Sequence, residues 1–182
     1  MKKIIIVLAL IPFISLKAQV KERFINAIDF EIGKEITYGG NLNEGHLLDD
    51  LSWAWSSQNA CFPKTQMHKF TGNHILFTGI IPAHSITTII LTPKNKKANL
   101  SLYAYQINLK EDFVVPNLPH CITCEVDFKW DYKKRGKKQN HQRIISDFTA
   151  IDSSYRIIIG VAGADGLTEA DFTIQVITKK YY

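Results

Sequence analysis

Residues 68–105 read HKFTGNHILFTGIIPAHSITTIILTPKNKKANLSLYAY, and the rest of the chain is organised around them. The stretch contains apolar and β-branched runs separated by two segments rich in proline, serine, asparagine and lysine, which favour turns. Each run is shorter than a typical helix, so the pattern predicts three consecutive strands. A buried helix remains an alternative only for the middle run. The expected strands are residues 68–81, 86–92 and 99–105.

The third of these expected strands alternates most clearly. Leu100, Leu102 and Ala104 fall on one face, and Tyr103 and Tyr105 fall on the other. Because successive side chains of a strand point to opposite faces, this pattern is typical of a half-buried strand. We therefore expect one face of this strand in the core and the other toward solvent.

The last third of the chain predicts further strands. In residues 155–161 and 172–177, isoleucine, valine and aromatic residues recur at every second position, and a glycine-rich turn separates the two segments. With shorter candidates at 121–128 and 144–149, the chain has about eight expected strands and no long amphipathic helix. The sequence therefore predicts an all-β fold, an antiparallel and jelly-roll-like β-sandwich. The side chains expected deepest in its core are Leu102, Ile157, Ile159, Phe172 and Ile174.

The first 18 residues have the pattern of a secretory signal peptide. Lys2 and Lys3 precede an apolar run at residues 4–16, and Ala18 ends the segment. Such a run is too short for a permanent membrane anchor. We therefore expect cleavage before Gln19, export to the periplasm or the medium, and one β-sandwich domain over residues 19–182.

Removal of residues 1–18 changes the charge of the chain. The full sequence has 22 basic and 17 acidic residues, and three basic residues lie within the first 18. The remaining 19 basic and 17 acidic residues give a net charge of +2. An exported and nearly neutral chain is not expected to bind nucleic acid.

The chain has three cysteines, Cys61, Cys121 and Cys124. Because export favours oxidation, we expect one disulfide from Cys61 to a member of the closely spaced pair. Cys61–Cys124 is the expected bridge, closing a loop of about 60 residues, and Cys61–Cys121 remains open. The CxxC spacing also occurs in zinc and redox sites. However, a zinc site needs further ligands, and a redox motif needs a helix where this sequence predicts a strand.

No catalytic constellation stands out in the sequence. The six histidines are scattered, and neither an HExxH motif nor a G-x-S-x-G elbow is present. Asp165, Glu169 and Asp171 offer oxygen ligands beside a glycine turn, but their spacing matches no EF-hand loop. We therefore predict no enzyme, no cofactor and no metal site, and we leave calcium at this turn as an open alternative.

The candidate ligand-binding residues form two groups. Residues 133–138, KKRGKK, predict a basic hairpin tip that contacts an anionic polysaccharide, a membrane surface or an acidic protein, unless it is only a solvated tip. Two tryptophans offer aromatic platforms for sugar rings, unless they close one end of the core. The candidates are Lys133, Lys134, Arg135, Lys137, Lys138, Trp53 and Trp55.

Several strand patterns resemble the bacterial pre-peptidase C-terminal (PPC) domain and related secreted sandwiches of Bacteroidetes. The resemblance covers roughly residues 26–178 and is carried by NAI at 26–28 with Gly33, HKFTG at 68–72, LSLYAY at 100–105, YRIIIGV at 155–161 and DFTIQV at 171–176. Domains of that family are non-catalytic and usually accompany secreted enzymes. The resemblance therefore implies a secreted, non-catalytic binding or interaction module, and a carbohydrate-binding module that uses exposed aromatic residues is the alternative.

Overall fold

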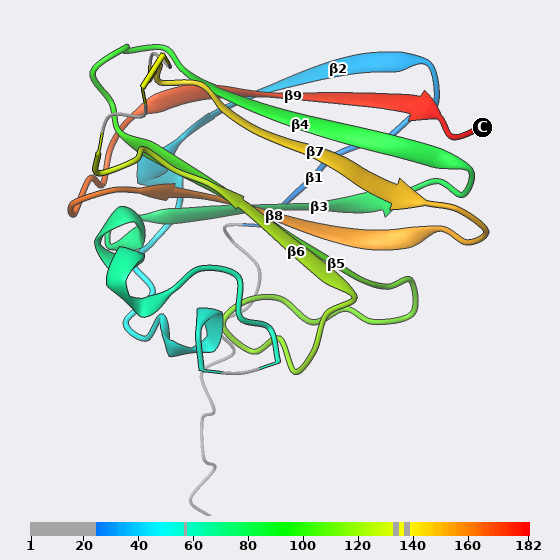
Figure 1. Cartoon of the computed structure of the whole chain (residues 1–182), viewed down its shortest axis with the longest axis horizontal. Coiled ribbons are helices and arrows are strands. Elements are labelled where there is room, and N and C mark those ends of the chain that lie inside the picture. The colour runs from blue at the N-terminus through cyan, green and yellow to red at the C-terminus, as the bar shows by residue number, and fades with distance from the viewer. Residues whose placement is uncertain (1–24, 57, 133–134, 137–138) are drawn as a thin grey trace, which may run out of the picture.

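The structure is a computed structural model that describes residues 25–56, 58–132, 135–136 and 139–182. The expected signal peptide and the cleavage site before Gln19 lie outside these residues. Two β-sheets pack against each other, with three short 3₁₀ helices beside them (Figure 1). The strands are β1 (Ile25–Ala27), β2 (Lys34–Asn41), β3 (His74–Ile81), β4 (Ser85–Pro93), β5 (Leu100–Asn108), β6 (Thr123–Asp127), β7 (Arg143–Ala150), β8 (Tyr155–Gly163) and β9 (Asp171–Lys180), and the 3₁₀ helices are η1 (Leu42–Glu44), η2 (Ser52–Ala54) and η3 (Lys64–Phe70).

The sheets confirm the all-β sandwich predicted from the sequence. One sheet has the order β1-β3-β8-β5-β6 and the other has the order β2-β9-β4-β7. Every pairing is antiparallel except that of β1 with β3, which is parallel. The described residues contain nine strands rather than about eight, because the three residues of β1 add an edge to the five-stranded sheet.

The main core lies between the two sheets and follows the predicted alternation. Leu102, Ile157 and Ile159 enter it from the five-stranded sheet, and Phe172 and Ile174 enter it from the four-stranded sheet. All five side chains have no exposed surface, as predicted. At about 25 cal/mol per Å² of apolar surface, burial on this scale is the dominant stabilising term of the fold.

Part of the outer face of the five-stranded sheet is also buried, which corrects the prediction that the strand expected at residues 99–105 is half-buried. In β5, Tyr103 and Tyr105 point away from the main core and are nonetheless fully buried. The segments that contain η2 and η3 and the connection from β5 to β6 fold beneath this sheet, in the lower part of Figure 1. They form a second core with the outer side chains of the sheet: Leu51, Trp53, Ala54, Phe62, Phe70, Leu76, Tyr103, Tyr105, Ile107, Val115, Leu118, Ile158 and Ala162.

The expected strand at residues 68–81 is wrong in its first half. Only β3 is a strand, and the residues before it form η3, which ends at Phe70. The Phe70 ring is fully buried and stacks on Phe62 with 3.8 Å between the ring centroids. Gly72 then passes so close to neighbouring backbone that a Cβ would lie 1.9 Å from the carbonyl oxygen of Leu167. Packing of Phe70 into the second core therefore turns the chain before the strand begins.

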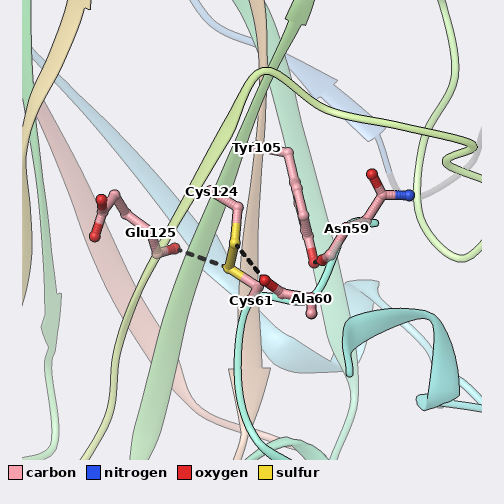
Figure 2. The surroundings of a disulfide bond; sticks show 6 residues. All are labelled: Asn59, Ala60, Cys61, Tyr105, Cys124 and Glu125. Atoms are coloured by element: carbon pink, nitrogen blue, oxygen red, sulfur yellow. Dashed lines mark hydrogen bonds between the residues drawn. A yellow bond between two sulfur atoms is a disulfide. The ribbon is translucent and has the colours of Figure 1, made fainter. Parts of the chain in front are cut away.

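The Cys61–Cys124 disulfide forms as predicted and links the segment between η2 and η3 to β6, at the edge of the five-stranded sheet (Figure 2). It joins residues 63 positions apart, and Cys121 is free. Cys61 Sγ lies 3.6 Å from the carbonyl oxygen of Glu125. Beside the bridge, the Tyr105 hydroxyl donates a hydrogen bond to the carbonyl oxygen of Asn59 at 2.9 Å. The covalent link and this hydrogen bond together hold residues 59–61 against the sheet.

Candidate binding cleft

The two tryptophans that the sequence nominated as sugar platforms have different environments. Trp53 is only 8% exposed, and its ring centroid lies 5.8 Å from those of both Tyr103 and Tyr105 and 6.2 Å from that of Phe62. Its ring faces are therefore covered by the second core, which corrects its nomination as a stacking platform. This is the core-closing role that the sequence left as the alternative.

Trp55 is half-buried and lines a small cavity of about 360 Å³ beneath the five-stranded sheet. The cavity also has exposed apolar groups, Leu47 and Met67, and two carboxylates, Asp49 and Asp50. The Asp50 carboxylate accepts hydrogen bonds from the backbone and the hydroxyl of Ser52, and these bonds lower its pKa. Trp55 alone of the two nominated tryptophans therefore faces an open space.

The basic segment is described only at its centre and at its base. Arg135 is exposed, and Lys133, Lys134, Lys137 and Lys138 lie outside the described residues. At the base, the Gln139 side chain accepts from the backbone N–H of Trp130 at 2.9 Å and donates to the carbonyl oxygen of Trp130 at 2.8 Å. These two hydrogen bonds close the loop that carries the basic segment.

A second set of contacts fixes the base of the loop to η3. The Asp131 carboxylate pairs with Lys69 Nζ at 2.5 Å and lies 3.5 Å from His68 Nε2, and it accepts from Gln66 Nε2 at 3.2 Å. Lys69 is only 6% exposed, although its type is seldom buried unless it is paired. The hydrogen bond from Lys69, followed by that from Gln66, lowers the pKa of Asp131. The ion pair between Asp131 and the buried Lys69 thus anchors the loop.

A cavity of about 720 Å³ lies beside the base of this loop. We call it the amide–lysine cleft. The β4–β5 loop and the segment before β7 form its walls, and both lie at the left end of the sandwich in Figure 1. No acidic side chain is among its described lining residues, which are Thr92, Pro93, Lys94, Lys96, Gln139, Asn140, His141 and Gln142.

Buried Arg143 supports one wall of the amide–lysine cleft. Its guanidinium donates to the carbonyl oxygens of Leu100, Asn140 and Gln142 at 2.9 to 3.0 Å, and its other end lies 3.4 Å from Asn99 Oδ1. The side chain is 3% exposed, and burial lowers its pKa. The guanidinium suits this role because its five N–H groups, held in a rigid fork, can bind several backbone carbonyl oxygens at once.

The polar groups of the amide–lysine cleft can both donate and accept. Asn140 Oδ1 accepts from the backbone N–H of Gln142 at 3.2 Å, and Gln142 Nε2 donates to Thr92 Oγ1 at 3.3 Å. The ammonium groups of Lys94 and Lys96 belong to exposed residues. Two cations and several amides that border one hollow can pair with an anion that also carries hydroxyl or amide groups.

Sequence reasoning missed the amide–lysine cleft. It assigned residues 93–97 to a turn and nominated only residues 133–138 as a basic surface. The available signal was the second cluster of lysines, Lys94, Lys96 and Lys97, in that turn. Their position beside Gln139 depends on the strand order, because β4 and β7 must be neighbours before the two loops can meet.

The described residues contain neither a metal-binding cluster nor a helix that could cross a membrane. No group of three or more histidine, cysteine or acidic side chains within the described ranges is arranged to hold a metal ion, the calcium candidates Asp165, Glu169 and Asp171 included. The Asp171 carboxylate instead accepts from Asn41 Nδ2 at 2.9 Å. No helix in the described part of the chain has the length and apolar character needed to cross a membrane.

Comparisons with known proteins give only remote structural likenesses. No protein-family model and no curated protein matches the sequence. Among solved structures, the periplasmic inhibitor of g-type lysozyme PliG from Aeromonas hydrophila is 11% identical with a TM-score of 0.42, covering 85% of this chain and 96% of that one. The VP2 subviral particle of infectious bursal disease virus is 12% identical with a TM-score of 0.32, covering 93% of this chain and 37% of that one.

Proposed function

We propose that this protein is a secreted, non-catalytic binding module that holds an anionic polymer in the amide–lysine cleft and along the adjoining basic segment. The observation that carries the proposal is the composition of the cleft. Lys94 and Lys96 line a hollow of about 720 Å³ that has no acidic residue among its described lining, and Lys138 directly precedes lining residue Gln139 in the sequence.

Electrostatics favours an extended anionic partner. The chain without its first 18 residues has a net charge of only +2, yet residues 133–138 contain five basic residues and residues 94–97 contain three. Like charges gathered on two neighbouring loops repel one another and contribute nothing to a core. A polyanion that spans both loops relieves this repulsion and is attracted over about a Debye length, roughly 8–10 Å at physiological salt.

Among anionic partners, an acidic polysaccharide fits the amide–lysine cleft better than a membrane surface or an acidic protein. Sugar hydroxyls both donate and accept, as do the side chains of Asn140 and Gln142 that line the hollow. A lipid surface is flat and requires no hollow lined with amides. The resemblance to non-catalytic PPC domains and the expected export agree with a role outside the cytoplasm.

Binding to immobilised heparin, a sulfated polysaccharide, tests the proposal. Replacing Lys94 and Lys96 with serine should weaken binding at least about tenfold, since a charge-assisted hydrogen bond is worth more than a neutral one. The matched control replaces Lys179 and Lys180, exposed lysines at the end of β9, with serine and removes the same charge. Neutral dextran should not bind, and added salt should release heparin.

The serine variant of all five basic residues at 133–138 should also lose heparin, and its melting temperature should stay nearly unchanged. Vesicles of anionic phospholipid and a polyglutamate peptide distinguish the partner classes. Equal loss of binding in the control and cleft variants, or equal binding of vesicles and heparin, contradicts the proposal.

A second candidate function rests on the cavity beside Trp55. An indole ring that lines the same cavity as Asp49 and Asp50 suits a neutral sugar, because an aromatic ring can stack on apolar C–H groups and carboxylates can accept from hydroxyls. A neutral-glycan array read with wild type and Trp55→Ala tests this function. Retention of neutral glycans by wild type and their loss from the variant support it, and an array without signal excludes it.

A further inference from the structure

Arg156 lies between two cavities that are separate from the amide–lysine cleft. It projects from β8 on the outer face of the five-stranded sheet, where its strand neighbours are Ile80 and Ile107. The cavities measure about 360 and 430 Å³ and share Ala27, Thr78 and Arg156 among their lining residues. We call this pair of hollows the Arg156 groove. None of its described lining residues also lines the cleft.

The guanidinium of Arg156 has a buried N–H without an acceptor. Its Nε atom is shielded from solvent and has no hydrogen-bond partner among the described residues. A buried donor left without an acceptor costs free energy, and such groups are rare in folded proteins. Because Nε itself is shielded, a ligand in the groove meets the guanidinium at its terminal N–H groups, whose planar fork matches the two oxygens of a carboxylate.

The other charges of the Arg156 groove are negative, which disfavours a simple anion. Asp112 lines the first cavity, and Asp29 and Glu31 line the second. Glu31 already forms an ion pair with Lys34. The exposed carboxylate of Asp112 therefore faces the same space as Arg156, and a ligand there meets one charge of each sign.

Apart from Thr78, the remaining walls of the first cavity are aliphatic. Ile25 and Ala27 come from β1, and Val114 comes from the connection between β5 and β6. Such walls take branched or short hydrocarbon groups, and they hold no aromatic ring for stacking a sugar. The charges and the aliphatic lining of this cavity together fit a small ligand that has a carboxylate, a cationic group and an aliphatic part.

We propose that the Arg156 groove binds a free aliphatic α-amino acid in its zwitterionic form. The carboxylate accepts from the terminal N–H groups of the Arg156 guanidinium. The ammonium group lies toward Asp112, and the side chain packs on Ile25, Ala27 and Val114. Each charge of the ligand thereby meets a charge of opposite sign.

Isothermal titration with three related molecules tests this site. L-Leucine should bind. The analogue 4-methylpentanoate lacks the ammonium group, and 3-methylbutylamine lacks the carboxylate. Both analogues should bind at least about tenfold more weakly than leucine. Arg156→Gln and Asp112→Asn should each weaken leucine binding by a similar factor. Lys179→Gln and Asp152→Asn change the same charges at exposed positions outside the groove and should leave leucine binding unchanged.

Three results would overturn the proposal. They are no leucine binding by the wild-type protein, equal binding of leucine and 4-methylpentanoate, and equal leucine binding by wild type and Arg156→Gln. The melting temperature of each variant identifies any loss of fold. Arg156→Lys, which keeps the charge without the planar fork, provides a second variant, and its affinity for leucine should be intermediate. Heparin binding by Arg156→Gln should match that of wild type, so failure of this site is distinguishable from failure of the amide–lysine cleft.

Discussion

His74 at the start of β3 predicts a loss of stability in mild acid. It has no exposed surface, and burial is the main reason that its pKa falls from 6.5 to about 4, with the nearby His46 adding to the fall. The ring is held neutral by its partners, because Nε2 donates to the carbonyl oxygen of Phe70 at 2.7 Å and Nδ1 accepts from the Tyr103 hydroxyl at 3.0 Å. Tyr103 remains a hydroxyl donor, since burial raises its pKa.

The direction and size of the effect follow from proton linkage. Between pH 6.5 and 4 the unfolded chain binds a proton at His74 and the folded protein does not, so acid favours unfolding. The stabilisation is fully present above pH 6.5 and is lost as the pH falls toward 4. At about 1.4 kcal/mol per pH unit, this single group accounts for about 3 kcal/mol across that window.

Urea unfolding of wild type and His74→Gln, followed by far-ultraviolet circular dichroism from pH 4 to pH 7.5, measures the effect. Glutamine can still donate and accept but does not titrate, so its free energy of unfolding should vary with pH by about 3 kcal/mol less than that of wild type. The other titrating groups, including the nearby His46, are common to both proteins. Parallel curves for the two proteins would refute the assigned protonation state of His74.

Three further predictions concern the core, the disulfide and export. Leu102→Ala should lower the free energy of unfolding by about 2–5 kcal/mol in urea, because it removes buried methyl groups from the main core, and a loss below about 0.5 kcal/mol would place the residue on the wrong face. Peptide mapping without reduction should recover Cys61 linked to Cys124, and removing the bridge should cost roughly 4 kcal/mol; a bridge to Cys121 would reverse the assignment. N-terminal sequencing of exported protein should begin at Gln19, and recovery of Met1 would contradict the signal peptide.

The strands were predictable where the two faces of a sheet differ in their exposure to solvent. In β9, apolar Phe172, Ile174 and Val176 are buried, and the residues between them remain partly accessible, so the period of two appears in the sequence. The same rule was misleading in β5, because Tyr103 and Tyr105 alternate with leucines but are buried on the opposite face. Loops without a periodic pattern cover them, and that cover becomes known only after the chain is folded.

The candidate site was predictable only in part for a related reason. A run of basic residues at 133–138 is visible in the sequence, but the hollow beside it needs two loops that are far apart in the chain. Arg143 illustrates the difficulty, since it is one cation among many in the sequence. Its role depends on the carbonyl oxygens of Leu100, Asn140 and Gln142, which the fold brings together.

Nuclear magnetic resonance tests the polyanion site most directly. Amide signals of ¹⁵N-labelled protein are followed while a short heparin oligosaccharide is added at low salt. The account predicts that the largest shifts occur at Thr92, at residues 94–97 and 139–142 and at Arg135, and that added salt reverses them. Shifts confined to the cavity beside Trp55 or to the Arg156 groove, or no shifts at any heparin concentration, would contradict it.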